Sequence, residues 1–83
     1  MITITFASHM AGILGDTTLE VEPEKNIRQL LHTLSLRYGA PFDEHIKACK
    51  VIVNGDNVAF LKGKSTALTN GDTITILPPM AGG

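Results

Sequence analysis

The chain has 83 residues and a mass of 8.9 kDa, which is enough for one small domain with a single core. Its formal net charge is −1 and aromatic residues make up 5% of it, so neither a basic field nor a base-stacking platform favours a nucleic-acid partner. Hydrophobic residues account for 43% of the sequence, too many for a disordered chain. The single cysteine, Cys49, excludes an internal disulfide and fits a reducing compartment.

The sequence carries no membrane or export signal. No apolar run approaches the ~18 residues that a membrane helix needs. The first residues alternate between apolar and polar side chains, without the basic segment that opens a signal peptide. We therefore expect a cytoplasmic protein without a membrane partner.

Two alternating segments open the chain. Residues 2–7 and 17–22 carry apolar side chains at every second position, which predicts two half-buried strands that pair as a hairpin. The segment between them, 8–16, contains Gly12 and Gly15 and is expected to be a loop. The strand residues predicted to point inward are Ile2, Ile4, Phe6, Leu19 and Val21.

One long amphipathic helix is predicted over residues 27–38. Asn26 stands at the N-cap position with Gln29 three residues later, which is a capping-box pattern, and Gly39 follows the last turn. Leu36 falls on the face opposite to the apolar stripe. The stripe itself consists of Ile27, Leu30, Leu31, Leu34 and Tyr38.

The second half of the chain alternates short elements with turn signals. Residues 42–49 are expected to form a short helical turn whose apolar side chains could cover Leu36. Residues 50–54 predict a buried strand, 58–61 a short strand, and 73–77 the last strand, with an Asn-Gly-Asp turn before each of the latter two. The order predicts an α+β domain with one main helix across a mixed sheet of four to five strands.

The last six residues, 78–83, differ from an ordinary terminus. Two prolines end the sheet pairing and favour a stiff extended path, whereas the two final glycines carry no Cβ atom. Six extended residues reach roughly 20 Å. We therefore predict a domain over residues 1–77 and a stalk that presents the α-carboxylate of Gly83.

Segments spread over most of the chain resemble the MoaD/ThiS group of ubiquitin-like sulfur carriers. The last sixteen residues are the most specific part, and their Pro-Pro-x-x-Gly-Gly ending is most similar to the small subunit of molybdopterin synthase. The segments that carry the resemblance are Phe6-Ala7-Ser8, Val53-Asn54-Gly55 with Val58, and Leu68–Asp72 continuing through Ile76 to Gly83.

The resemblance implies a β-grasp fold and a chain that is not an enzyme by itself. An E1-like adenylating enzyme would use ATP and Mg to adenylate Gly83, and a sulfur donor would convert the adenylate to a thiocarboxylate. The thiocarboxylate would then enter the large subunit of molybdopterin synthase and give its sulfur to the pyranopterin precursor there, in a heterotetramer that holds two carriers. The residues expected to present Gly83 to these partners are Pro78, Pro79, Met80, Ala81 and Gly82.

A second candidate site follows from strand parity. If Ile74 and Ile76 face the helix, then Leu77, Ala7 and Ile52 lie on the open face of the sheet. We expect these three residues to form an apolar docking patch beside the stalk.

Other functions find little support in the residues. His45 and Cys49 have no second pair of ligands for a structural metal site, and no nucleophile with a base can be assigned. Three alternatives stay open: a ubiquitin-like modifier conjugated through Gly83, a sulfur carrier for thiamine or another pathway, and a plain binding module.

Overall fold

The computed structural model of the protein describes residues 1–78, and within this part of the chain five strands form one mixed sheet. The strands are β1 (Ile2–Phe6), β2 (Thr18–Val21), β3 (Lys50–Val53), β4 (Asp56–Asn57) and β5 (Thr73–Leu77). Their order across the sheet is β2-β1-β5-β3-β4. The central strands β1 and β5 run parallel, and all other neighbours are antiparallel.

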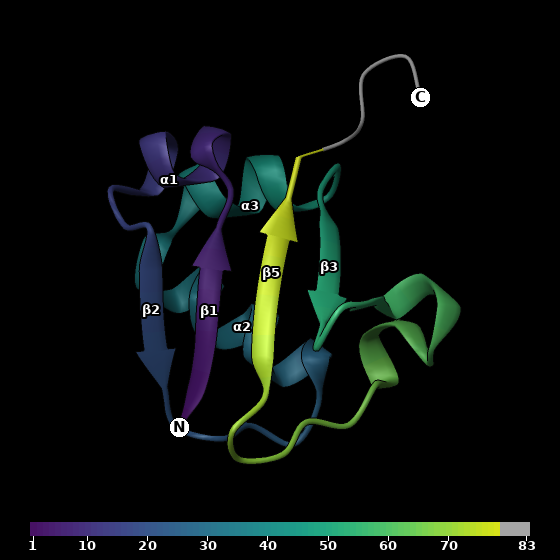
Figure 1. Cartoon of the computed structure of the whole chain (residues 1–83). Coiled ribbons are helices and arrows are strands. Elements are labelled where there is room, and N and C mark those ends of the chain that lie inside the picture. The colour runs from purple at the N-terminus through teal and green to yellow at the C-terminus, as the bar shows by residue number, and fades with distance from the viewer. Residues whose placement is uncertain (79–83) are drawn as a thin grey trace.

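Helices cover one face of this sheet (Figure 1). They are α1 (Ser8–Leu14), α2 (Ile27–Tyr38) and α3 (Ala40–Ile46), and two 3-10 turns follow at Val58–Phe60 and Gly63–Ser65. The predicted α+β fold with a main helix on a mixed sheet is confirmed.

The core lies between the sheet and the helices. Alternate residues of the strands point into it, as the period of two predicts, and they meet the apolar stripe of α2. The buried apolar residues are Ile2, Ile4, Phe6, Met10, Ile27, Leu30, Leu34, Phe42, Val51, Val53, Leu68, Ile74 and Ile76.

The segment between β1 and β2 is a helix, so the expectation of a loop over 8–16 was wrong. Met10 is fully buried, and Ile13 and Leu14, three and four residues on, pack against the same core. This helical spacing outweighs the cost of Gly12 in the helix. Gly15 ends the helix at φ 85° and donates its N–H to the Ala11 carbonyl, which is a left-handed cap that favours glycine.

Helix α2 has the predicted bounds and N-cap. The Asn26 side chain accepts a hydrogen bond from the Gln29 N–H at 3.0 Å, and Gln29 Oε1 accepts one from the Lys25 N–H at 3.3 Å. At the other end, the Tyr38 hydroxyl donates to Asp16 at 2.7 Å. Burial and this bond raise the pKa of Tyr38, and the contact ties the end of α2 to the segment before β2.

Helix α3 begins two residues earlier than predicted. Pro41 stands in its first turn, where the missing N–H costs no helical hydrogen bond. Phe42 from this turn is buried in the core and does not cover Leu36, which is 75% exposed. Leu36 is therefore a surface leucine on the outer face of α2.

The prediction of a short strand at 58–61 was wrong, because only Asp56 and Asn57 pair with β3. The Asn57 side chain accepts the N–H of Ala59 at 2.9 Å, so this N–H is held in a helical turn that leaves the sheet. Phe60 consequently lies 86% exposed.

The turns at the lower end of the sheet in Figure 1 have the predicted chemistry. Asn54 and Gly55 both have positive φ, 50° and 93°, as a two-residue hairpin turn requires. Asp72 accepts bonds from the Thr69 N–H at 2.8 Å and from the Asn54 side chain at 3.0 Å. These bonds favour the carboxylate and hold the pKa of Asp72 below its ordinary value.

Candidate functional site

The end of β5 is the point from which the predicted stalk departs. This strand lies in the middle of the sheet, between β1 and β3. It ends with Leu77 at the same end of the sheet as α1 and α3 (Figure 1). Pro78 follows and is half-buried. The predicted site residues Pro79, Met80, Ala81, Gly82 and Gly83 lie outside the described residues.

The three residues predicted for the docking patch share the open face of the sheet. Their strand neighbours Phe6, Ile76 and Val51 are buried on the helix side, so Ala7, Leu77 and Ile52 point the other way.

The register places two of these residues close to the root of the stalk. Ala7 donates its N–H to the Ile76 carbonyl at 3.0 Å, next to Leu77. Ile52 pairs with Thr75, one pleat further down the sheet. All three side chains are half-buried, and the role of this patch in partner binding stays a prediction.

Threonines make up much of the remaining open face. Thr3 pairs with Thr73, and Thr5 pairs with Thr75. Thr3, Thr5 and Thr75 are half-buried and Thr73 is exposed, and such β-branched side chains pack well on a pleated surface. The predicted patch therefore extends from the end of β5, at Leu77 and Ala7, to Ile52 opposite the middle of that strand.

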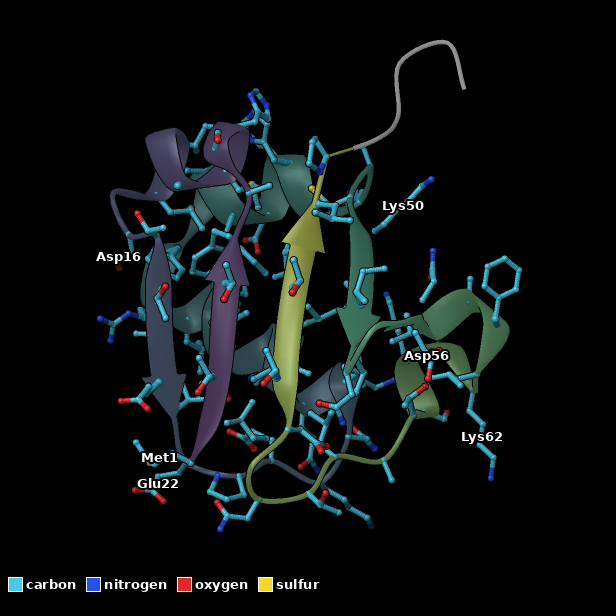
Figure 2. All side chains as sticks on the ribbon, viewed as in Figure 1. Met1, Asp16, Glu22, Lys50, Asp56 and Lys62 are labelled. Atoms are coloured by element: carbon cyan, nitrogen blue, oxygen red, sulfur yellow. The ribbon has the colours of Figure 1, made fainter. Side chains whose placement is uncertain are left out.

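A cation that we did not predict flanks this end of the sheet. Lys50 is the register partner of Leu77, and its side chain extends outward at the start of β3 (Figure 2). A lysine at the root of the predicted stalk would favour an acidic partner surface. Only the pairing of β3 with β5 shows this proximity, because the two residues are far apart in the sequence.

The neighbouring thiol has the properties of a structural cysteine. Cys49 is half-buried and its Sγ contacts the His45 carbonyl at 3.2 Å. Burial raises the pKa of the Cys49 thiol, which lowers its thiolate fraction and hence its reactivity. Within residues 1–78, no three His, Cys, Asp or Glu side chains gather as metal ligands would.

Taken together, the described residues form a β-grasp domain whose C-terminal strand lies in the middle of the sheet and ends beside its open face. Comparison with known proteins agrees with this class. The model of the ThiS family matches residues 4–83, and the chain belongs to this family.

Two curated relatives are similar over most of the chain. Small archaeal modifier protein 3 of Haloferax volcanii is 48% identical, covering 99% of this chain and 98% of that protein. A protein of Archaeoglobus fulgidus that is named as a candidate sulfur carrier is 33% identical, covering 78% of this chain and 83% of that protein. The family of the chain thus comprises sulfur carriers and ubiquitin-like modifiers.

Solved structures share the fold. The complex of BexX and CysO from Amycolatopsis orientalis contains a chain that matches with a TM-score of 0.83 at 22% identity, with 100% of both chains covered. A molybdopterin converting factor subunit 1 candidate from Pyrococcus furiosus matches with a TM-score of 0.80 at 21% identity, covering 95% of this chain and 97% of that one. At these identities the likeness confirms the β-grasp fold.

None of the helices in residues 1–78 is long and apolar enough to cross a membrane.

Proposed function

We propose that the protein is a sulfur carrier whose C-terminal Gly83 is adenylated and converted to a thiocarboxylate. The observation that supports this most is the family match, which extends through residue 83 and so includes the terminal Gly-Gly. The fold supports it too, because β5 ends in the middle of the sheet next to an open face on which a partner can dock.

The chemistry needs no catalytic group from this chain. In an E1-like enzyme, a Gly83 carboxylate oxygen attacks the α-phosphorus of ATP, and pyrophosphate leaves. The terminal sulfur of a donor persulfide then attacks the acyl carbon, and AMP leaves. A thiol finally cleaves the S–S bond of this acyl disulfide, which releases the thiocarboxylate and leaves a disulfide on the donor side.

Within this class we propose the molybdopterin pathway, with the protein as the small subunit of molybdopterin synthase. The Pro-Pro-x-x-Gly-Gly ending and the fold shared with a molybdopterin converting factor subunit 1 candidate support this role. Two carriers in a heterotetramer with the large subunit would then supply the two sulfurs of the dithiolene.

Protein modification is the second candidate, and the 48% identity to a small archaeal modifier protein over 99% of the chain favours it. The same adenylate serves both outcomes. In the modifier, the amine of a target lysine attacks the acyl carbon and AMP leaves, which forms an isopeptide bond at Gly83.

The intact mass of the protein purified from its own cells separates the two candidates. A carrier shows one oxygen replaced by sulfur, and the change is lost after deletion of Gly83. A modifier instead appears as conjugates on other proteins, with Gly83 joined to lysine in tryptic peptides. An unmodified mass without conjugates would contradict both candidates.

The pathway is tested with the thiocarboxylated protein and a molybdopterin synthase large subunit. We expect the pair to convert the pyranopterin precursor to the dithiolene, with one thiocarboxylate consumed for each sulfur transferred. Conversion by a thiamine-pathway synthase alone would contradict the molybdopterin assignment while leaving the carrier chemistry intact.

A further inference from the structure

Two hollows meet between α2, the end of α3 and the outer edge of β3. One has a volume of about 330 Å³ and the other about 570 Å³. Both are lined by Leu31, Ile46, Lys47 and Lys64, so they form one continuous depression. We call this depression the basic groove.

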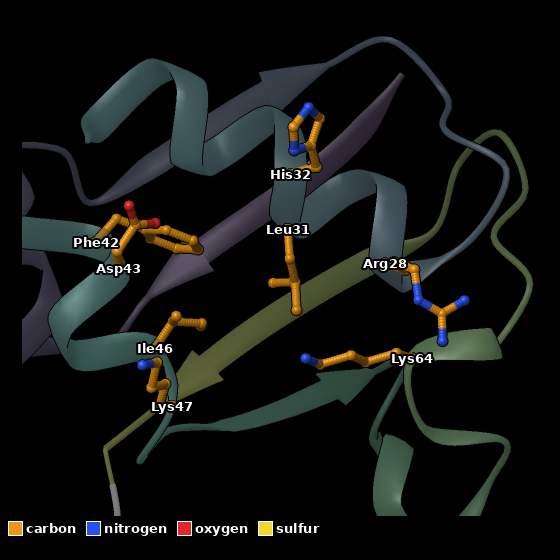
Figure 3. Close-up of a pocket in the computed structure, with 8 residues that line it drawn as sticks. All are labelled: Arg28, Leu31, His32, Phe42, Asp43, Ile46, Lys47 and Lys64. Atoms are coloured by element: carbon orange, nitrogen blue, oxygen red, sulfur yellow. The ribbon is translucent and has the colours of Figure 1, made fainter. Parts of the chain in front are cut away.

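The floor of the basic groove is apolar and its rim is cationic. Figure 3 shows Leu31 in the middle of the first hollow, with Arg28 and Lys64 on one side and Ile46 and Lys47 on the other. Val51 and Val58 continue the floor, and Lys50 continues the rim, in the second hollow.

The rim concentrates the positive charge of the molecule. Four of the seven Lys and Arg residues of the chain line the groove: Arg28, Lys47, Lys50 and Lys64. One carboxylate, Asp43, also lines it, and this group accepts a hydrogen bond from the Ser35 hydroxyl. A protein of net charge −1 therefore presents a locally positive surface around an apolar floor, which attracts acidic segments.

The groove also borders an open strand edge. On its outer side β3 is paired with β4 only through Ile52 and Val53, because the chain leaves the sheet at Val58. In the described part of the chain, Lys50 and Val51 have register partners on β5 and none on β4. An extended peptide can add to such an edge and place alternate side chains in the adjoining groove.

We propose that the basic groove binds an extended segment of a partner protein that is apolar at its centre and acidic at its flanks. Apolar side chains would cover Leu31, Ile46 and Val58, while carboxylates would meet the lysines of the rim. The floor residues Leu31, Ile46 and Val58 lie outside the predicted docking patch, and Lys50, the register partner of Leu77, borders both sites.

The probe is a synthetic peptide with a Val-Ile-Val-Ile centre flanked by Asp and Glu. Titrated into the ¹⁵N-labelled full chain at low salt, it is expected to shift the amide signals of Ile46, Lys50, Val51 and Val58. Binding should weaken as salt is added, because the rim charges are exposed. A peptide with Lys in place of Asp and Glu should not bind.

Two double variants with the same change in net charge distinguish an effect of the groove lysines on peptide binding from an effect of the overall charge of the protein. Lys47→Glu with Lys64→Glu reverses the rim and should weaken binding by about tenfold or more. Lys25→Glu with Lys62→Glu, at positions outside the groove lining, should weaken it by only about twofold. The amide spectra of both variants verify that they are folded.

Several results would overturn the proposal. One is no binding at millimolar peptide, and another is an equal loss of peptide affinity in the two double variants. A third is a set of amide shifts confined to the open face at Thr5 and Thr75. A fourth is a dimer in sedimentation whose interface covers the groove. The chain lacking Gly83 should bind the peptide as well as the parent, so a failure here is distinguishable from a failure of the sulfur-carrier function.

Discussion

At two positions, the burial of an apolar residue differs from what the neighbouring sequence suggests. Met10 lies in a segment with two glycines, yet it is fully buried and anchors α1 to the core. Leu36 is the opposite case, since it is a large apolar residue in the middle of α2 and is 75% exposed. The two residues form a natural pair for testing which apolar contacts stabilise the fold.

Replacing Met10 by Ala is expected to lower the free energy of unfolding by about 2–5 kcal/mol, because it leaves a cavity in the core. Leu36→Ala should change it by less than about 0.5 kcal/mol. Urea unfolding followed by circular dichroism measures both variants. Equal effects of the two substitutions would contradict the burial described for α1.

Asp72 is expected to make the stability of the fold depend on pH. Its pKa in the folded protein is lowered by the Thr69 N–H and the Asn54 side chain, so the carboxylate form stabilises the fold. This contribution is present above the pKa of the unfolded chain and is lost as the pH falls through the folded pKa.

We expect Asp72→Asn to lose less stability than the parent between about pH 6 and about pH 2, a range that spans ordinary Asp pKa values. The measurement is the urea midpoint at each pH, and the Asp72 carboxyl is titrated in parallel by NMR. Identical pH profiles for parent and variant would show that this hydrogen-bonded turn does not couple to folding.

At the scale of elements, α2 depends on its N-cap as well as on its apolar stripe. Asn26→Ala removes the acceptor for the Gln29 N–H and should cost about 1 kcal/mol of unfolding free energy. Asn26→Asp keeps an acceptor and should cost much less. The pair is compared by thermal or urea unfolding, and a fully stable Ala variant would argue against the cap.

Strong periodicity made most elements predictable, and competing local bonds account for the rest. Residues 27–38 and 73–77 follow from spacing, caps and turns, and the structure has these bounds. Residues 58–61 follow an Asn-Gly-Asp turn as the second strand of a hairpin would, but the Asn57 side chain accepts the Ala59 N–H and favours a helical turn. Over residues 8–14, the burial of Met10 in the core stabilises a helix that glycine by itself disfavours. This burial depends on tertiary contacts, which a local sequence pattern does not contain.

Of the candidate sites, one could be predicted from the sequence and the other could not. Strand parity alone placed Ala7, Ile52 and Leu77 on one face, because side chains alternate in every strand. The lysines of the basic groove come from separate places in the chain: Lys47 follows α3, Lys50 opens β3 and Lys64 lies in the second 3-10 turn. Only folding brings them together. Their spacing in the sequence carries no signal.

At the scale of the whole molecule, the folded body and the terminus that we propose to react are separate parts of the chain. The regular elements end at Leu77, so deletion of Gly83 should leave the free energy of unfolding within about 0.5 kcal/mol of the parent. The amide spectrum of residues 1–78 should also be unchanged apart from signals near Pro78. A large loss of stability on this deletion would contradict the separation.

The most direct test of the central claim is ATP–pyrophosphate exchange by the E1-like enzyme from the same cells. The full chain should stimulate exchange, because formation of the Gly83 adenylate releases pyrophosphate reversibly. The folded chain lacking Gly83 should not stimulate it. Equal exchange with both proteins, or none with either, would contradict the claim that the terminal carboxylate is the group on which the partner enzyme acts.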